Sequence, residues 1–236
     1  YDGFEGAKLR DIDWDVIVID EASMIPLAEI VYPIYKCETA QIVIAGDPFQ
    51  IDPIVKIEEW ANENIYTLVQ LNDFKNPRTV PHQFEVQKLC TQYRSTPNVG
   101  QIYSKFAYGG ILQHHRTAES RKQIEFGLPF KSLNIVSFPT NKSSSLYEPK
   151  RLMMSNIHIY SVLFVAEFID YIIKQIGASG KADRVSIGVI SPYGAEVGAI
   201  DKLCQQKLKD VNSNIEISCG TAHGFQGDEC DIVIVV

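Results

Sequence analysis

The segment Val16-Ile17-Val18-Ile19-Asp20-Glu21-Ala22-Ser23 joins four β-branched apolar residues directly to two acidic ones. A continuous apolar run of this kind is typical of a strand buried on both faces of a parallel sheet. Polar groups that follow such a strand lie at the carboxyl edge of the sheet, where catalytic groups of α/β proteins gather. There, Asp20 can hold Mg²⁺ beside phosphates while Glu21 deprotonates a water molecule; the alternative is that Asp20 only caps the next helix.

A second apolar run, Gln41 to Ala45, is followed by Gly46-Asp47-Pro48-Phe49-Gln50. Residues 25–35 between the two runs predict a short helix or an irregular connection, because two prolines limit its length. Two strands joined by such a crossover predict a parallel sheet. Gln50 can then sense a terminal phosphate or a water molecule, whereas the alternative is a Gly-Asp-Pro turn with a solvated glutamine.

Two further polar segments follow predicted strands. The strand expected over 85–89 leads to Tyr93 and Arg94, a ring that can stack on a base and a guanidinium that can stabilise the charge of phosphoryl transfer. The alternative for Arg94 is a surface salt bridge. The strand expected over 215–219 leads to Gly220–Glu229, whose glycines allow a ligand to approach the backbone closely.

The remaining periodicity predicts an alternation of strands and helices. Strands are expected over residues 133–138, 185–190 and 231–236, and helices over residues 97–107, 157–176 and from about 193 to 209. The polar stretch 113–150 is expected to run mostly over the surface.

Composition excludes several classes of protein. The 236 residues carry a net charge of −7 and are 45% hydrophobic, as in ordinary globular chains of one large or two compact domains. The five cysteines form no CxxC pair, which argues against a zinc site and favours a reducing compartment. No apolar run reaches the roughly 20 residues of a membrane span. Residues 86–236 are only mildly basic, too weakly for an autonomous nucleic-acid binder.

Taken in order, these segments resemble the motifs of superfamily 1 helicases in the Upf-one-like branch. The resemblance covers nearly the whole chain except about 113–155. The matching segments are motif II at 20–23, motif III at 46–51, motif IV at 92–97, a Ser-Pro-Tyr segment at 191–193 and motif V at 221–235. Two positions depart from the family pattern: Asp52 stands where proline is common, and Glu196 where glutamine is common.

The resemblance implies an α/β fold made of the parallel sheets of two RecA-like P-loop NTPase domains, both incomplete. Residues 1–84 would be the C-terminal part of the first domain and 85–236 most of the second. The resemblance also implies ATP and Mg²⁺ as cofactors and single-stranded DNA or RNA as partner. In the first domain, Asp20 would hold Mg²⁺, Glu21 would be the general base, and Gln50 would couple the γ-phosphate to the strand-binding surface.

The same resemblance assigns roles in the second domain. Arg94 would be an arginine finger and Tyr93 would pack near the adenine, while Gly227 and Glu229 would face the ATP ribose and phosphate. The nucleic acid would be contacted by Ser191, Pro192, Tyr193, Thr221 and His223.

Two helicase motifs have no match. The P-loop pattern G-x-x-x-x-G-K-[ST] is absent, although Gly3 to Leu9 contains glycines and a lysine, and no arginine-bearing motif VI precedes Val236. The sequence therefore predicts part of an ATP-dependent helicase or translocase, a cytoplasmic or nuclear hydrolase whose other domains lie in the same parent chain. The 236 residues alone are expected to be inactive. The alternatives are a nucleic-acid-binding or protein-interaction module with a vestigial motor, and a different P-loop enzyme such as an ATP-driven nuclease or a kinase.

Overall fold

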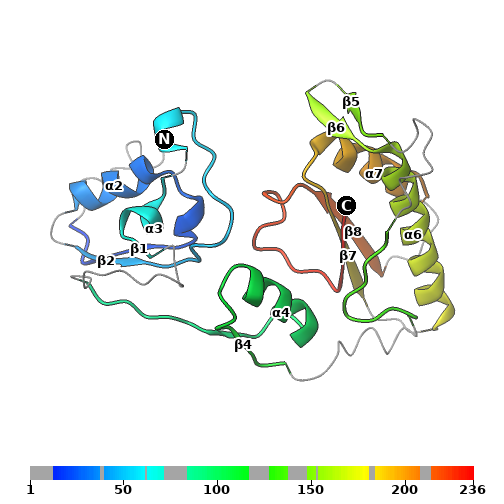
Figure 1. The fold of residues 1–236 in the computed structure, drawn as a ribbon, viewed down its shortest axis with the longest axis horizontal. Helices are drawn as coiled ribbons and strands as arrows, with labels where there is room; N and C mark the ends of the chain where they lie inside the picture. The colour runs from blue at the N-terminus through cyan, green and yellow to red at the C-terminus, as the bar shows by residue number, and fades with distance from the viewer. Residues whose placement is uncertain are drawn as a thin grey trace. The chain divides into compact units, whose positions relative to one another are not determined.

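The computed structural model describes residues 13–37, 40–61, 63–71, 84–116, 128–137, 148–152, 154–180, 184–207 and 214–236. Their contacts divide the chain into two compact units (Figure 1). The first unit comprises the described residues of Tyr1–Gln92 together with Gly100–His115, and the second those of Tyr93–Val99 and Arg116–Val236. Helices accompany small parallel sheets in both units, which confirms the predicted α/β class.

The first unit is built on two parallel strands. Strand β1 (Val16–Ile19) pairs with β2 (Gln41–Ile44) in the register Val16↔Gln41 to Ile19↔Ile44. The crossover contains the 3₁₀ helix η2 (Ala22–Met24) and helix α2 (Leu27–Lys36). The sequence predicted this parallel pair and its short crossover helix, which extends past Pro33 for one further turn.

The burial of these strands differs from the prediction. One side of the pair packs on a small core with α2 and the short helix α3 (Ile65–Leu68); its buried residues are Ile19, Ala22, Ile30, Ile65 and Tyr66. On the other side Val16, Val18 and Val43 are 46%, 64% and 49% exposed. The expectation that both faces are buried is therefore wrong for the described residues, because the elements described around β1 and β2 cover one face only.

A middle segment contains β3 (Thr91–Gln92), α4 (Pro97–Phe106) and β4 (Gln113–His114), with β3 and β4 parallel. The helix confirms the N-terminal signal at Pro97. The strand expected over 85–89 is wrong: those residues pair with no strand, and Leu89 is 94% exposed. Strand pairing begins only at Thr91, which pairs with Gln113 of β4. Contacts place residues 100–115 with the first unit, so the assignment of 85–236 to a second RecA-like domain stays a prediction.

The second unit contains a parallel sheet of β7 (Val185–Ile190), β8 (Ile215–Gly220) and β9 (Ile232–Val235) in the order β8-β7-β9. The sequence predicted these three strands, but not their order. The other elements of this unit are β5 (Lys150–Leu152), β6 (Ser155–Ile157), α6 (Ile159–Ala178) and α7 (Gly194–Lys207). The antiparallel hairpin β5–β6 was not predicted. Residues 133–137 form no strand, contrary to expectation, and Phe138 lies outside the described residues.

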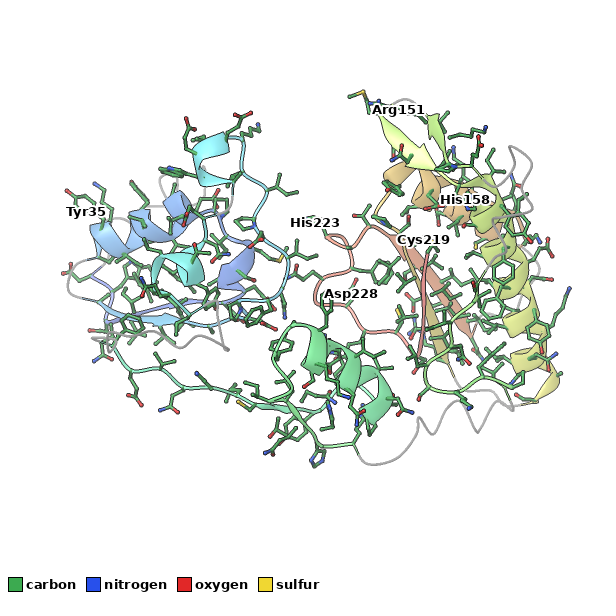
Figure 2. The ribbon with its side chains drawn as sticks, viewed as in Figure 1. Tyr35, Arg151, His158, Cys219, His223 and Asp228 are labelled. Carbon is green, nitrogen blue, oxygen red and sulfur yellow. The ribbon has the colours of Figure 1, made fainter. Side chains whose placement is uncertain are left out.

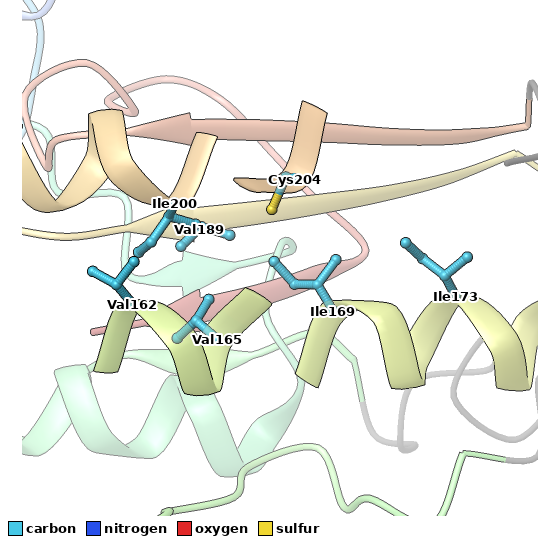
Figure 3. Packing of buried hydrophobic residues seen from close by; sticks show 7 residues of the cluster. All are labelled: Val162, Val165, Ile169, Ile173, Val189, Ile200 and Cys204. Atoms are coloured by element: carbon cyan, nitrogen blue, oxygen red, sulfur yellow. The ribbon is translucent and has the colours of Figure 1, made fainter. Parts of the chain in front are cut away.

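Helix α6 forms the core of this unit with the sheet and α7. Figure 3 shows its apolar stripe facing β7 and α7. The buried cluster consists of Val162, Val165, Ile169, Ile173, Val189, Ile200 and Cys204. None of the described helices, α6 included, has the combination of length and apolar composition needed to span a bilayer.

Candidate functional site

Asp20 and Glu21 directly follow β1, and both side chains are exposed. Asp20 Oδ1 accepts the backbone N–H of Glu21 at 2.8 Å. Glu21 adopts a left-handed backbone with φ 50° and ψ 39°, a conformation that non-glycine residues rarely hold without support. The support is a hydrogen bond from the next residue, because Ala22 N–H donates to Ala45 O at 3.1 Å. The Asp20 side chain does not cap the following helix η2, so the alternative role predicted for Asp20, that of a helix cap only, is not observed.

The end of β2 lies beside this bend. Asp47 Oδ1 accepts the Phe49 N–H at 3.0 Å, and Oδ2 accepts the hydroxyl of Tyr108. The rings of Phe49 and Tyr108 meet edge to face with centroids 5.4 Å apart. Burial and the hydrogen bond to Asp47 raise the pKa of Tyr108 above its usual value. Gln50 N–H donates to Asp47 O at 3.2 Å, and the Gln50 side chain is exposed. Hydrogen bonds to both carboxylate oxygens of Asp47 thus hold the turn that carries Gln50.

The donors at this edge fit a magnesium ion that also binds phosphate. Mg²⁺ in nucleotide sites takes one or two carboxylates and completes its octahedron with phosphate oxygens and water. Asp20 and Glu21 offer such carboxylates in adjacent, exposed positions. Within the described part of the chain, no three His, Cys, Asp or Glu side chains gather into a metal site of their own. The two neighbouring carboxylates match the number that such an ion takes from the protein.

Arg94 and Glu229, both predicted to face the nucleotide, contact each other in the second unit. Arg94 Nε donates to Glu229 Oε1 at 2.5 Å, and both side chains are 61% exposed. This exposed ion pair is the surface salt bridge that the sequence left open as the alternative for Arg94, and a pair of this kind is worth about 0–1 kcal/mol. The neighbouring Tyr93 is 62% exposed, and Gly227 has φ 87° in the left-handed region. The structure brings Arg94, Tyr93 and Glu229 to one locality of this unit.

The Ser-Pro-Tyr segment is tied to the start of motif V. Ser191 N–H donates to Gly220 O at 3.2 Å. The Ser191 hydroxyl is fully buried; it donates to Glu196 Oε2 at 2.6 Å and accepts the Tyr193 N–H at 3.2 Å. Ser191 therefore orients the turn, while Pro192 and Tyr193 present their side chains to solvent.

The loop between β8 and β9 carries Thr221 and His223, the other residues predicted to contact nucleic acid. Figure 2 labels His223 on this loop. Thr221 Oγ1 accepts the Gly224 N–H at 3.4 Å, and Thr221 O accepts the Phe225 N–H at 3.1 Å. This turn leaves His223 exposed. The backbone of the loop is thus fixed by local hydrogen bonds while the imidazole stays accessible.

Both departures from the family pattern have structural roles. Glu196 is 3% exposed and also accepts the His158 N–H at 3.3 Å, so its carboxylate joins α7 to the start of α6. Asp52 Oδ1 accepts Asn64 Nδ2 at 2.8 Å, which ties the segment after motif III to the N-cap of α3.

Sequence reasoning missed Tyr66, a tyrosine of α3 beneath the first-unit site. Its side chain is buried, and its hydroxyl has no hydrogen-bond partner among the residues described. Burial and the charges of Asp47, Glu21 and Asp20 raise the pKa of Tyr66. Its only sequence signal is an aromatic residue in an apolar turn, which normally indicates core packing.

Residues 57–236 match the protein family described as "AAA domain", over more than half of the chain. The chain belongs to the AAA domain family. This family has the RecA-like P-loop fold, which agrees with the parallel sheets of both units. Together with the relatives below, the match confirms the resemblance to superfamily 1 helicases in the Upf-one-like branch.

Curated relatives match this AAA domain chain over almost its full length. It is 27% identical to the DNA polymerase alpha-associated DNA helicase A of Saccharomyces cerevisiae, over 94% of the chain and 33% of the relative. It is 27% identical to the DNA replication ATP-dependent helicase/nuclease dna2 of Schizosaccharomyces pombe, over 94% of the chain and 16% of the relative. It is 24% identical to the helicase SEN1 of Saccharomyces cerevisiae, over 95% of the chain and 10% of the relative. The chain thus spans a third or less of these relatives.

Proposed function

We propose that this chain supplies part of the motor of a helicase or translocase, in which Mg-ATP hydrolysis drives movement along single-stranded DNA or RNA. The observation that carries the proposal is the exposed carboxylate pair Asp20–Glu21, which follows a parallel strand on a left-handed bend held by the neighbouring strand. One relative named as an ATP-dependent helicase/nuclease and two named as helicases support the same reading.

In this proposal the first unit performs the acid–base chemistry. Asp20 would hold Mg²⁺, which would neutralise phosphate charge when bound. Glu21 accepts the proton of the attacking water, and Gln50, exposed on the turn after β2, senses the terminal phosphate. The hydrogen bonds at Asp47 hold that turn in place.

The second unit stabilises the charge of the transferring phosphoryl group and contacts the single-stranded nucleic acid. Arg94 leaves Glu229 for the transferring phosphoryl group, while Tyr93, Gly227 and Glu229 face the adenosine part of ATP. The residues proposed to contact the nucleic acid are Pro192, Tyr193, Thr221 and His223, with Ser191 orienting Tyr193. Residues 1–84 and 85–236 would belong to two RecA-like domains of a cytoplasmic or nuclear protein. Residues 1–236 alone would not turn over ATP, because their sequence contains no match to a P-loop.

The test measures ATP turnover by the full-length protein and its binding to single-stranded DNA or RNA, called strand binding below. Wild-type protein should hydrolyse Mg-ATP faster when single-stranded DNA or RNA is added. Arg94→Ala should lower kcat by about 1000-fold, the scale of an arginine finger, and keep strand binding. Arg184→Ala is the matched control, because Arg184 also forms an exposed ion pair, with Glu216 at 2.7 Å. Equal loss of turnover and strand binding in Arg94→Ala would contradict the role of Arg94. Strand binding by wild-type protein without turnover would favour a vestigial motor.

A further inference from the structure

Glu196 is a buried acidic residue that takes no part in the proposed function. It lies in the first turn of α7 and is 3% exposed. Its two oxygens accept one hydrogen bond each, from the His158 N–H at 3.3 Å and from the Ser191 hydroxyl at 2.6 Å. Burying a carboxylate costs free energy unless its oxygens are hydrogen-bonded, so this side chain depends on both donors.

The Ser191 hydroxyl connects Glu196 to the backbone of Tyr193. Ser191 is fully buried, and its Oγ donates to Glu196 Oε2 and accepts the Tyr193 N–H at 3.2 Å. A hydroxyl has one proton and two lone pairs, whereas an ionised carboxylate only accepts hydrogen bonds. The Ser191 proton is therefore directed at Glu196, and a lone pair of Oγ is left for the Tyr193 N–H. Glu196 thus determines how this hydroxyl is oriented.

The backbone of Tyr193 is held on both sides. Its carbonyl accepts the N–H groups of Glu196 and Val197, in the first turn of α7, at 3.1 Å each, and its own N–H donates to Ser191. The Tyr193 side chain, in contrast, is 42% exposed. An exposed ring on a fixed backbone loses little conformational freedom when a base stacks on it. This arrangement favours a stacking contact between Tyr193 and an unpaired base.

Another hydrogen bond at the start of α7 does not involve Tyr193. Ser155 Oγ, from strand β6, accepts the Ala195 N–H at 3.2 Å, and Figure 1 shows β6 beside α7. Ser155 and Ser191 thus both bond to backbone N–H groups at the same end of the helix. Of the two hydroxyls, the one that bonds to Tyr193 is that of Ser191. This difference separates a role in helix stability from a role in presenting the tyrosine ring.

We propose that Glu196 is a positioning residue for strand binding: through the Ser191 hydroxyl it holds the Tyr193 backbone, so that the exposed ring stacks on an unpaired base. The inference rests on the proposed function, in which Tyr193 contacts the nucleic acid, and adds the kind of contact and the residue that controls it. Stacking on an aromatic ring tolerates every base, so this contact suits a protein that moves along strands of any sequence.

The experiment measures the Kd of the full-length protein for fluorescent oligothymidine and oligouridine strands by anisotropy. Glu196→Met keeps the length of the side chain but removes both acceptors, and should weaken binding about 3- to 10-fold, the scale of one hydrogen bond. Glu196→Gln should stay within about 2-fold of wild type, because its carbonyl can accept the His158 N–H while its amide donates to Ser191 Oγ. Ser155→Ala is the matched control and should bind like wild type, since Tyr193 keeps its hydrogen bonds.

The same change in a Tyr193→Ala background separates positioning from stability. Tyr193→Ala alone should weaken strand binding about 5- to 150-fold, the scale of one stacked base. In that background Glu196→Met should leave the Kd unchanged, because the ring through which Glu196 acts is gone. If Glu196→Met does not fold, as judged by circular dichroism, Ser191→Ala takes its place in every comparison, because it removes the hydroxyl that joins Glu196 to Tyr193.

Three results would overturn the inference. The first is a wild-type Kd in Glu196→Met, and the second is an equal loss of affinity with and without Tyr193. The third is a loss in Ser155→Ala or Glu196→Gln as large as that in Glu196→Met. If wild-type protein binds neither strand, or if Tyr193→Ala binds as tightly as wild type, the proposed function or its contact at Tyr193 fails, and the inference with it. If Tyr193→Ala weakens binding and Glu196→Met does not, only the inference about Glu196 fails.

Discussion

At the scale of single residues, the carboxyl edge of β1 and β2 depends on two unusual backbone conformations. Glu21 is left-handed at φ 50°, and Gly46 has φ 144°. The Ala22 N–H donates to Ala45 O, just past the end of β2, and so holds the backbone that follows Glu21. Gly46 allows Tyr66 and Ala22 to approach the same point. The site is thus assembled from the turn geometry as much as from its acidic side chains.

We predict that Gly46→Ala lowers the free energy of unfolding by about 2 kcal/mol, because the new Cβ meets Tyr66 and Ala22 and the backbone is unfavourable for alanine. Urea unfolding followed by circular dichroism measures this. Gly198→Ala is the control: it lies inside α7, where a new Cβ would meet no described atom within 4 Å apart from its chain neighbours and its own helix backbone. That change should raise stability by about 0.5–1 kcal/mol. A Gly46→Ala protein as stable as wild type would contradict the packing described.

At the scale of elements, sequence patterns predicted what depends on apolar periodicity. Helix α6 and strands β7, β8 and β9 were predicted because their own residues determine burial. The expected strand at 85–89 failed because a strand also needs a partner, and β4 meets the chain only at Thr91. The hairpin β5–β6 was missed because its strands have only three residues each, too few for a regular alternation of apolar and polar residues to show. Burial of both faces of β1 could not be judged without knowing which elements cover it.

The same distinction holds for the candidate site. Asp20, Glu21 and Arg94 were proposed from their places after apolar runs and from motif order. The pairing of Arg94 with Glu229 spans 135 residues of sequence and had no local signal. Tyr66 was missed because an aromatic residue in a short apolar turn indicates core packing. Only the structure shows that its buried hydroxyl has no hydrogen-bond partner among the described residues.

A prediction at the element scale concerns the tie between the loop after motif III and α3. Asp52→Ala should lower the free energy of unfolding by about 1–2 kcal/mol, because Asn64, 3% exposed, loses the acceptor of its amide. Asp52→Asn keeps an acceptor oxygen and should remain close to wild type. Urea unfolding followed by tryptophan fluorescence reports this, since Trp14 and Trp60 both belong to the first unit. Equal stability of Asp52→Ala and wild type would show that the tie is dispensable.

At the scale of the whole molecule, the proposed chemistry is divided between the two compact units. The first carries the carboxylates and the turn with Gln50, and the second carries Arg94, Glu229 and the residues proposed to contact nucleic acid. Neither unit has a complete set of catalytic groups in this proposal. Hydrolysis should therefore respond to changes in either unit, whereas folding of each unit depends on its own core.

The most direct measurement is ATP binding and ATP turnover by full-length Glu21→Gln, with Glu58→Gln as an exposed control from the same unit. Glutamine keeps the size of Glu21 but cannot accept the proton of the attacking water, while Asp20 remains to hold Mg²⁺. Binding of Mg-ATP should be retained and kcat should fall by about 100-fold or more, with Glu58→Gln equal to wild type. Turnover by Glu21→Gln at the wild-type rate would contradict the assignment of the carboxylate pair as the hydrolytic site.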